Sequence, residues 1–464
     1  MGGYKFLMRY YSPGSEIYFF GFSRGAYTAR FLAQMLDYVG LLSTGNEEML
    51  RFAWKTFALW QARTDSTPQE KGRKHQTFQF MRKFRETFSR PVDRIRFIGL
   101  FDCVNSVPQF EAAWMSRSKF PYTAKTSAEV IRHAVSIDER RAKFRQDLVS
   151  EQETTSAIGM RAHTWRWHHD AKPEVSGEEK LSDRPQLNRH RSSRQERFRP
   201  RQRFQVNLST APSQISIDST ARVRERQEEV RQGDESPDID DDEQDILEVW
   251  FAGQHGDVGG GWTGEDEPAS DLPLLWMLRE AQKTGMPFDD AKLQAAHIVF
   301  NQRQAPGIPQ AEVDGRPVRE LSNAAREIRR LATETRIHDS LKFGGGFSWY
   351  SVAAWQVMEH LPFRRMDLQS DGSWKPISWP LPRGETRDIP ANAIVHSSVI
   401  RRMEVNERYR PGNLIVGGGG RGIKIAPKSA GIGEWRVIRD HGDSIGEAFV
   451  RADATSTGST RDRG

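Results

Sequence analysis

Residues 17–30 read "IYFFGFSRGAYTAR", and an apolar run in this segment stops at Ser23, between Gly21 and Gly25. A continuous apolar run is typical of a strand that is covered on both faces of a parallel sheet. A segment with helical spacing follows at once, and the pattern G-x-S-x-G describes a tight strand-to-helix turn that exposes a serine hydroxyl. The segment therefore predicts an α/β fold and makes Ser23 a candidate nucleophile.

The same alternation of strand and helix recurs along the chain. Predicted strands at 95–101 ("IRFIGLF") and 246–251 ("ILEVWF") lead to Asp102 and His255, and a helix is predicted at 271–285. Strands that alternate with helices are typical of βαβ units and a parallel sheet. We therefore expect a parallel sheet with flanking helices.

The composition indicates that one segment of the chain does not fold around a hydrophobic core. Of the 464 residues 37% are apolar and 28% are charged, and residues 150–245 hold a basic run at 189–204 and an acidic run at 234–245. Neighbouring runs of opposite charge are typical of a solvated, disordered insert. The expected organisation is a first part of the core at 1–149, a disordered charged insert at 150–245, a second part of the core at 246–450 and a disordered tail at 451–464.

The net charge and the cysteine content argue against several classes of partner and site. Lys and Arg total 68 against 62 for Asp and Glu, and this small excess does not favour a nucleic-acid partner. Cys103 is the only cysteine, which excludes an intramolecular disulfide and a multi-cysteine metal cluster. The sequence shows no signal-peptide pattern and no apolar run of about 18 residues. We expect a cytoplasmic protein with no cofactor and no metal.

A second G-x-S-x-G match, at 442–446, serves as an internal control. The sequence after Ser444 passes into the tail, and no histidine follows it. The usual chain order of serine, acid and histidine therefore cannot be completed from Ser444, whereas it can be completed from Ser23.

A serine nucleophile needs a general base, and that base needs a carboxylate to orient it. Asp102 and His255 each follow a predicted strand, at the edge where open α/β sheets build their sites. His338 and His396 are rival bases without a clear strand before them. Asp102 as a turn residue and His255 as a loop histidine remain the structural alternatives.

The loop "HGDVGGG" at 255–261 is rich in glycine, as expected where backbone approaches a ligand closely. A phosphate-binding role is less favoured because the P-loop lysine is missing. Asp257 is an alternative triad acid or a ligand for a divalent ion. Cys103 fits an inert core position, and the aromatic segment at 343–363 is interpreted as core or as a lid over the substrate.

Five separated blocks of sequence agree in order with one known family. The chain resembles, over about 1–145 and 246–300, an α/β-hydrolase domain family of bacteria and fungi that includes the Tle1-like phospholipase effectors of type VI secretion. The blocks are "GFSRGAYTARFLAQML", "IGLFDCV", "HAVSIDERR", "WFAGQHGDVGGGW" and "DLPLLWMLREA".

The resemblance implies that Ser23 is the nucleophile, Asp102 the acid and His255 the base. It also implies hydrolysis of carboxylesters or phospholipid acyl esters through an acyl-enzyme. We further expect the backbone N–H of Arg24 to stabilise the oxyanion and its side chain to meet an anionic head group. The other oxyanion or substrate contacts expected are Gly21, Gly25 and Asp257, and the expected partners are the lipid or ester substrate and, transiently, a membrane surface.

The chain departs from the family near its start. Family members usually carry a Phe-Asp-Gly-Thr-like strand well upstream of the nucleophile, whereas 22 residues precede Ser23 here. We therefore expect the N-terminal strands of the family to be missing, and with them some oxyanion-hole donors. The alternative function is a truncated, inactive hydrolase-like protein that acts as an interaction scaffold through its charged insert.

Overall fold

The computed structural model describes most of the two predicted core parts. The predicted insert 150–245, apart from its last two residues, and the tail 451–464, apart from its first two, lie outside the described residues. The described residues are 1–61, 68–104, 126, 128–149, 244–262, 269–295, 311–313, 316–318, 323–361, 365–368, 374–377, 383–416 and 423–452.

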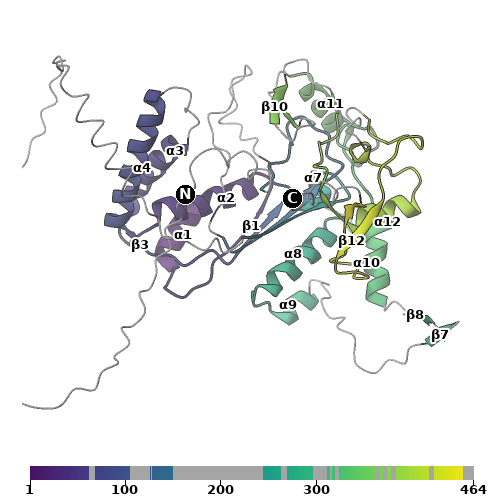
Figure 1. Ribbon diagram of the computed structural model, residues 1–464, viewed down its shortest axis with the longest axis horizontal. Helices are drawn as coiled ribbons and strands as arrows, with labels where there is room; N and C mark the ends of the chain where they lie inside the picture. The colour runs from purple at the N-terminus through teal and green to yellow at the C-terminus, as the bar shows by residue number, and fades with distance from the viewer. Residues whose placement is uncertain are drawn as a thin grey trace, which may run out of the picture. The chain divides into compact units, whose positions relative to one another are not determined.

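A seven-stranded sheet forms the centre of the fold (Figure 1). From one edge to the other its strands are β1 (Tyr18–Phe22), β4 (Phe97–Phe101), β5 (Val130–Ser136), β6 (Asp245–Phe251), β11 (Ile394–His396), β13 (Ala448–Arg451) and β12 (Trp435–Arg439). Neighbours from β1 to β11 pair in parallel, and β13 pairs antiparallel with β11 and β12. The predicted α/β fold with a largely parallel sheet is confirmed.

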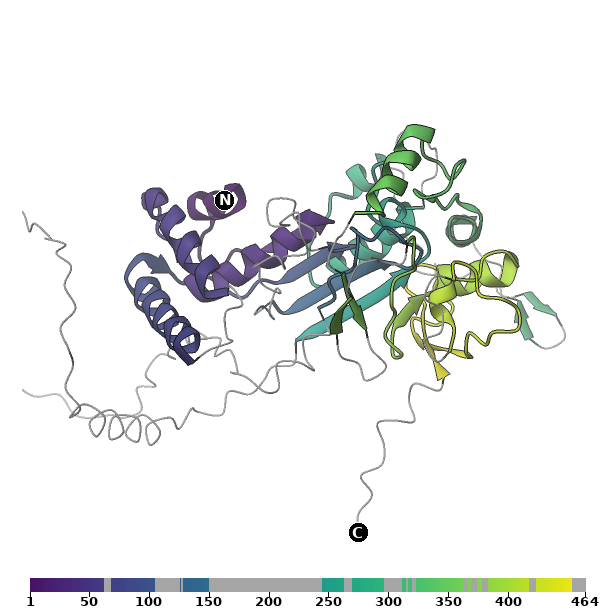
Figure 2. The same cartoon turned by 90° about the horizontal axis from the view of Figure 1, so that it is seen from above.

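Helices cover both faces of this sheet, with α2 on one face and α8 on the other (Figure 1; Figure 2 gives the view from above). The helices are α1 (Gly2–Tyr10), α2 (Arg24–Val39), α3 (Leu50–Gln61), α4 (Pro68–Phe88), α7 (His255–Gly259), α8 (Asp271–Lys283), α9 (Asp290–Ala295), α10 (Asn323–Glu334), α11 (Trp349–Met358) and α12 (Ser397–Val405), with 3₁₀ turns η1 (Glu47–Met49) and η2 (Gly412–Leu414). Three antiparallel strand pairs complete the described elements: β2 (Leu41–Leu42) with β3 (Ser89–Arg90), β7 (Ala311–Val313) with β8 (Arg316–Val318), and β9 (Arg365–Leu368) with β10 (Trp374–Ile377).

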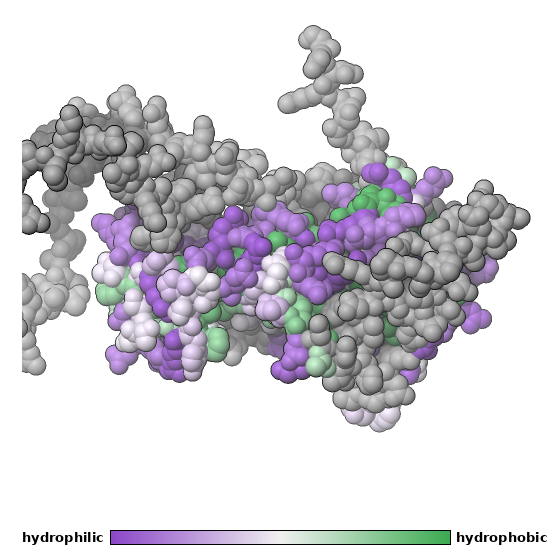
Figure 3. Space-filling model, turned by 90° about the horizontal axis from the view of Figure 1, so that it is seen from below, coloured by the Kyte–Doolittle hydropathy of each residue, from purple (hydrophilic) through white to green (hydrophobic). Residues whose placement is uncertain are grey.

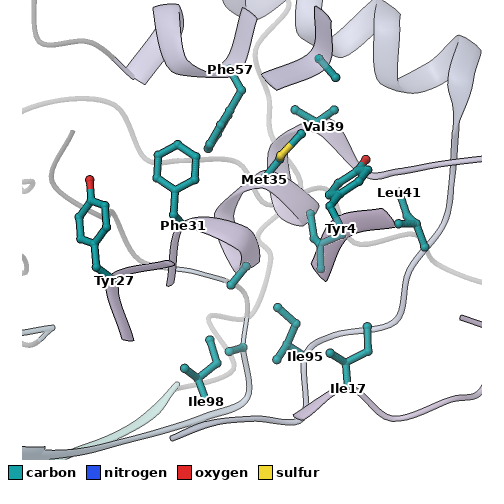
Figure 4. Close-up of a cluster of buried hydrophobic side chains, with 14 of the residues drawn as sticks. Tyr4, Ile17, Tyr27, Phe31, Met35, Val39, Leu41, Phe57, Ile95 and Ile98 are labelled. Atoms are coloured by element: carbon teal, nitrogen blue, oxygen red, sulfur yellow. The ribbon is translucent and has the colours of Figure 1, made fainter. Parts of the chain in front are cut away.

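The side chains on the two faces of β4 pack in two different apolar clusters, because successive side chains of a strand point to opposite faces. On one face Ile98 joins Phe31 and Met35 of α2 (Figure 4). On the other face Phe97 joins Trp276 of α8. The helical spacing of apolar residues in α2 and α8 thus matches the faces that these helices bury.

The structure corrects some strand predictions. The apolar run before Ser23 forms β1, which continues to Phe22, directly before the nucleophile candidate. Strand β5 was not predicted, because Arg132 and His133 interrupt its apolar pattern. Both side chains are buried through ion pairs or hydrogen bonds with carboxylates of neighbouring elements. His396 ends the short strand β11, although no strand was expected before it.

The face of the molecule in Figure 3 is mostly hydrophilic where described residues are coloured, and hydrophobic side chains form separate small areas. Some large apolar side chains are nevertheless exposed, among them Trp349 of α11 and Tyr10 of α1, at 73% and 68%. None of the described helices is both long enough and apolar enough to cross a lipid bilayer.

The two glycines that flank Ser23 should differ in their tolerance of a methyl group. A Cβ on Gly21 would lie 2.5 Å from the carbonyl oxygen of Gly25 and 2.6 Å from the nitrogen of Ala26. A Cβ on Gly25 would meet open space in the described part of the chain. We expect G21A to lower the free energy of unfolding by roughly 1–3 kcal/mol, and G25A, within a helix, to change it by less than about 1 kcal/mol. Equal urea midpoints for G21A and G25A would contradict this packing.

Candidate active site

The turn between β1 and α2 holds Ser23 in a strained conformation. Its backbone has φ 58° and ψ −124°, and a positive φ is uncommon for a residue with a side chain. The N–H of Ser23 donates to the carbonyl oxygen of Phe101 at 2.9 Å, which fixes the turn to the end of β4. Ser23 is half-buried and lies at the carboxyl end of β1.

Close backbone contacts make this turn possible. Helix α2 starts at Arg24 and lies so close to β1 that a side chain at Gly21 would strike its first turn. Helix α7, which follows β6, also lies close to the turn, since a Cβ on Gly259 would overlap the ring of Phe22. Arg24 and Gly25 are exposed. The first N–H groups of a helix have no intrahelical acceptor, so these two residues present donors beside Ser23.

Asp102 follows β4 directly and is fully buried. Its φ of 41° turns the chain sharply after the strand, and its N–H donates to the carbonyl oxygen of Ala134 at 2.7 Å. The backbone N–H of Ser136 donates to Oδ1 of Asp102 at 2.8 Å. These contacts with the end of β5 orient the carboxylate.

His255 lies between Ser23 and Asp102. Its Nδ1 is 2.6 Å from Oδ2 of Asp102, and its Nε2 is 2.8 Å from Oγ of Ser23. The rings of Phe22 and Phe144 lie 4.6 Å from the imidazole, centroid to centroid, and limit its rotation. Three side chains from three strand ends thus form one continuous chain of hydrogen bonds.

Arg387, which sequence reasoning did not identify, clamps the carboxylate of Asp102. Its Nη1 and Nη2 donate to Oδ1 and Oδ2 at 2.5 and 2.8 Å. The same guanidinium donates to the carbonyl oxygens of Ser136 and Phe144, and both members of the ion pair are fully buried. Arg387 therefore connects the acid with the residue that packs on the imidazole. It stands in the segment "RGETRDIP", which matches no motif.

The clamp fixes the charge of the acid. Burial by itself would raise the pKa of Asp102, but the charge of Arg387 and the hydrogen bond to His255 outweigh burial and hold this pKa well below its usual range. An ionised Asp102 accepts a hydrogen bond from Nδ1 of His255. The Nε2 lone pair is then directed at the hydroxyl of Ser23, which is the arrangement that a general base needs.

A second carboxylate holds the backbone of His255. The N–H of His255 donates to Oε2 of Glu139 at 3.2 Å, and Glu139 is paired with Arg141 at 2.8 Å. Burial would raise the pKa of Glu139, but Arg141 outweighs it and the pKa is lowered to about 2. The guanidinium of Arg141 also lies 3.8 Å from the ring centroid of Phe144. The support of His255 thus comes largely from the segment after β5.

Asp257 and His338 form a separate pair behind the loop. Nδ1 of His338 is 2.6 Å from Oδ1 of Asp257, whose Oδ2 accepts from the N–H groups of Gln254 and His338. Asp257 is 0% exposed, and Trp262 stacks on His338 at 3.5 Å between centroids. The expected substrate contact of Asp257 has no support in this geometry, because its carboxylate is used to cap α7 and hold His338.

The remaining candidates take structural positions in the described fold. Nδ1 of His396 accepts from the N–H of Ser398, and burial lowers the pKa of His396 to about 4. Burial raises the pKa of Cys103 to about 12, which keeps it a thiol. Ser444 is buried in the turn between β12 and β13, so a strand follows it rather than a helix.

Comparison with known proteins supports the family resemblance. Residues 1–280 match the family model described as "T6SS, Phospholipase effector Tle1-like, catalytic domain". The uncharacterized protein YEL023C of Saccharomyces cerevisiae is 30% identical over 89% of this chain and 68% of the yeast protein. No solved structure matches the chain. The matched residues include Ser23, Asp102 and His255, whereas Arg387 lies beyond them.

Removing the guanidinium of Arg387 should destabilise the fold, because it leaves the carboxylate of Asp102 buried without its cation. We expect R387M to lower the free energy of unfolding at pH 7 by about 3–5 kcal/mol. A carboxylate whose pKa is lowered in the folded protein stabilises the fold at pH values above its pKa in the unfolded chain. This contribution is lost as the pH falls from that value toward the folded pKa. The difference in stability between wild type and R387M should therefore shrink below about pH 4. Urea unfolding of wild type and R387M between pH 3 and 7 measures this.

The matched control is R383M, which removes an exposed arginine four positions earlier. We expect it to change the free energy of unfolding by less than about 0.5 kcal/mol. An R387M deficit no larger than that of R383M would contradict the clamp.

Proposed function

This chain belongs to the family of the Tle1-like phospholipase effector catalytic domain, and we propose that it hydrolyses acyl esters of phospholipids through an acyl-enzyme on Ser23. One observation carries the proposal: Oγ of Ser23 is 2.8 Å from Nε2 of His255, whose Nδ1 is 2.6 Å from Asp102. These distances suit proton transfer between serine and imidazole.

In the first half of the reaction Oγ of Ser23 attacks the ester carbonyl carbon while its proton passes to Nε2 of His255. The tetrahedral intermediate collapses as His255 returns this proton to the leaving alcohol, and the acyl group stays on Ser23. In the second half His255 takes a proton from water, the resulting oxygen attacks the acyl-enzyme, and the proton returns to Ser23 as the carboxylic acid leaves. Asp102 stabilises the imidazolium in both halves and remains ionised.

The first turn of α2 supports an oxyanion site. The backbone N–H of Arg24 follows the nucleophile directly and lies at the positive end of the helix dipole, where developing negative charge is favoured. The side chain of Arg24 is exposed beside Ser23. We assign it to the phosphate of the lipid head group, for which a guanidinium is well suited.

Arg387 acts in this proposal as a positioning residue. It touches Asp102 and the carbonyl oxygen of Phe144 and has no place among the reacting atoms. By holding Asp102 and the backbone of Phe144, whose ring packs on the imidazole, it keeps the imidazole aligned between the acid and the nucleophile. The proposed catalytic unit therefore extends beyond residues 1–280.

The direct test replaces the nucleophile in one variant and the control serine in another. Purified wild type, S23A and S444A are assayed on a panel of phospholipids and short-chain esters. We expect S23A to lose at least about a thousandfold in kcat, because removal of a serine nucleophile abolishes the covalent route. S444A should retain the wild-type rate to within about twofold, provided that circular dichroism shows it folded.

Two results would contradict the proposal. One is hydrolysis by S23A at the wild-type rate. The other is a folded wild type that hydrolyses no member of the panel, which would favour the interaction-scaffold alternative.

A further inference from the structure

We infer that the exposed side of α11 and of the turn before it binds the surface of a membrane that contains anionic phospholipids. This inference rests on the proposed function and extends it, because it states how the substrate is presented. The surface, called here the α11 surface, consists of Phe343, Trp349, Tyr350, Val357 and Leu361, which are 56%, 73%, 64%, 65% and 41% exposed.

The α11 surface is unusual for a helix of an α/β domain. Such a helix normally turns its apolar side chains toward the sheet and polar ones toward water. In α11 (WYSVAAWQVM) Val352 is fully buried, while Trp349 and Tyr350 at its start are more exposed than buried. Tryptophan and tyrosine have an apolar ring with a polar end, and both are enriched where membrane and water meet.

The charges around the α11 surface favour an anionic partner. Residues 336–361 contain two carboxylates, Asp339 and Glu359, and both are buried, at 6% exposure each. Asp339 is paired with Arg140 and Lys424. Glu359 accepts from the N–H groups of Ala142 and Gly384.

The exposed ionic side chains of the same residues are those of Arg336 and Lys342. Arg383 is also exposed and lies beside α11, where its Nη1 donates to Nε2 of His360 at 2.6 Å. Each basic side chain near an anionic membrane contributes about 1 kcal/mol of attraction, which corresponds to roughly fivefold in affinity. Exposed aromatic rings and exposed basic side chains each favour contact with the surface of an anionic membrane.

The inner side of α11 connects this surface with the proposed active site. Trp355 packs on Phe144, with 5.3 Å between ring centroids, and Phe144 packs on the imidazole of His255. Arg141 lies over both Trp355 and Phe144. A membrane bound at the α11 surface would therefore be connected to the imidazole of His255 through the rings of Trp355 and Phe144.

The test measures binding rather than catalysis. All variants carry S23A, so that the vesicles stay intact. Each protein is sedimented with vesicles of phosphatidylcholine alone or of phosphatidylcholine with phosphatidylglycerol. We expect S23A to bind the anionic vesicles, W349S/Y350S to bind them at least about tenfold more weakly, and K342E to lose part of the preference for phosphatidylglycerol.

The matched control is F6S/Y10S, which removes an exposed aromatic pair from α1. These rings are 60% and 68% exposed and lie 4.9 Å apart. The control should bind vesicles as S23A does. Absence of vesicle binding by S23A, equal binding by W349S/Y350S, or an equal loss in F6S/Y10S would each overturn the inference and leave a protein partner as the occupant of the α11 surface.

Hydrolysis of a soluble short-chain ester by proteins with an intact Ser23 separates this inference from the proposed function. W349S/Y350S should hydrolyse it at the wild-type rate to within about twofold, because neither side chain contacts Ser23, Asp102 or His255 among the contacts of the described residues. One combined outcome would contradict the proposed function alone. In it, wild type hydrolyses neither ester nor lipid, while W349S/Y350S in the S23A background still weakens vesicle binding. The inference that the α11 surface binds a membrane would then be upheld.

Discussion

The buried ion pair between Arg387 and Asp102 is the interaction on which the geometry of the candidate site depends. Two charges without access to water are costly unless each is fully compensated. Asp102 is compensated by Arg387, His255 and the N–H of Ser136, and Arg387 by Asp102 and the carbonyl oxygens of Ser136 and Phe144. The pair thereby fixes the end of β4, the end of β5 and the position of the imidazole at once.

Buried ion pairs also connect other helices and loops to the sheet. Arg132 of β5 pairs with Glu280 of α8 at 2.5 Å, and Arg30 of α2 pairs with Asp147 at 3.0 Å, with all four side chains at most 5% exposed. Replacing such a pair by apolar residues is often neutral for stability, whereas removing one partner is not. In this fold the buried ion pairs therefore specify how helices and loops meet the sheet, while the apolar clusters on its two faces drive folding.

The sequence allowed the fold class and the meeting of Ser23, His255 and Asp102 to be predicted, because each of these residues follows an apolar strand and parallel strands end at one edge of a sheet. It did not reveal β5, since buried arginine and histidine look like surface residues until their carboxylate partners are known. Arg387 was missed for a related reason: its contact with Asp102 spans 285 positions and depends on tertiary structure alone. Asp257 was expected at the substrate because it lies in the glycine-rich loop, but its local role as a helix cap is not visible in composition.

A serine that is activated by a histidine differs from other serines in its reactivity toward fluorophosphonates. The decisive measurement is peptide mass mapping after reaction of the folded protein with such a reagent. The serine-hydrolase mechanism predicts one adduct per chain, on Ser23, and its loss when His255 is replaced by glutamine. An adduct on another residue, or none on a wild-type protein that unfolds cooperatively, would contradict the mechanism.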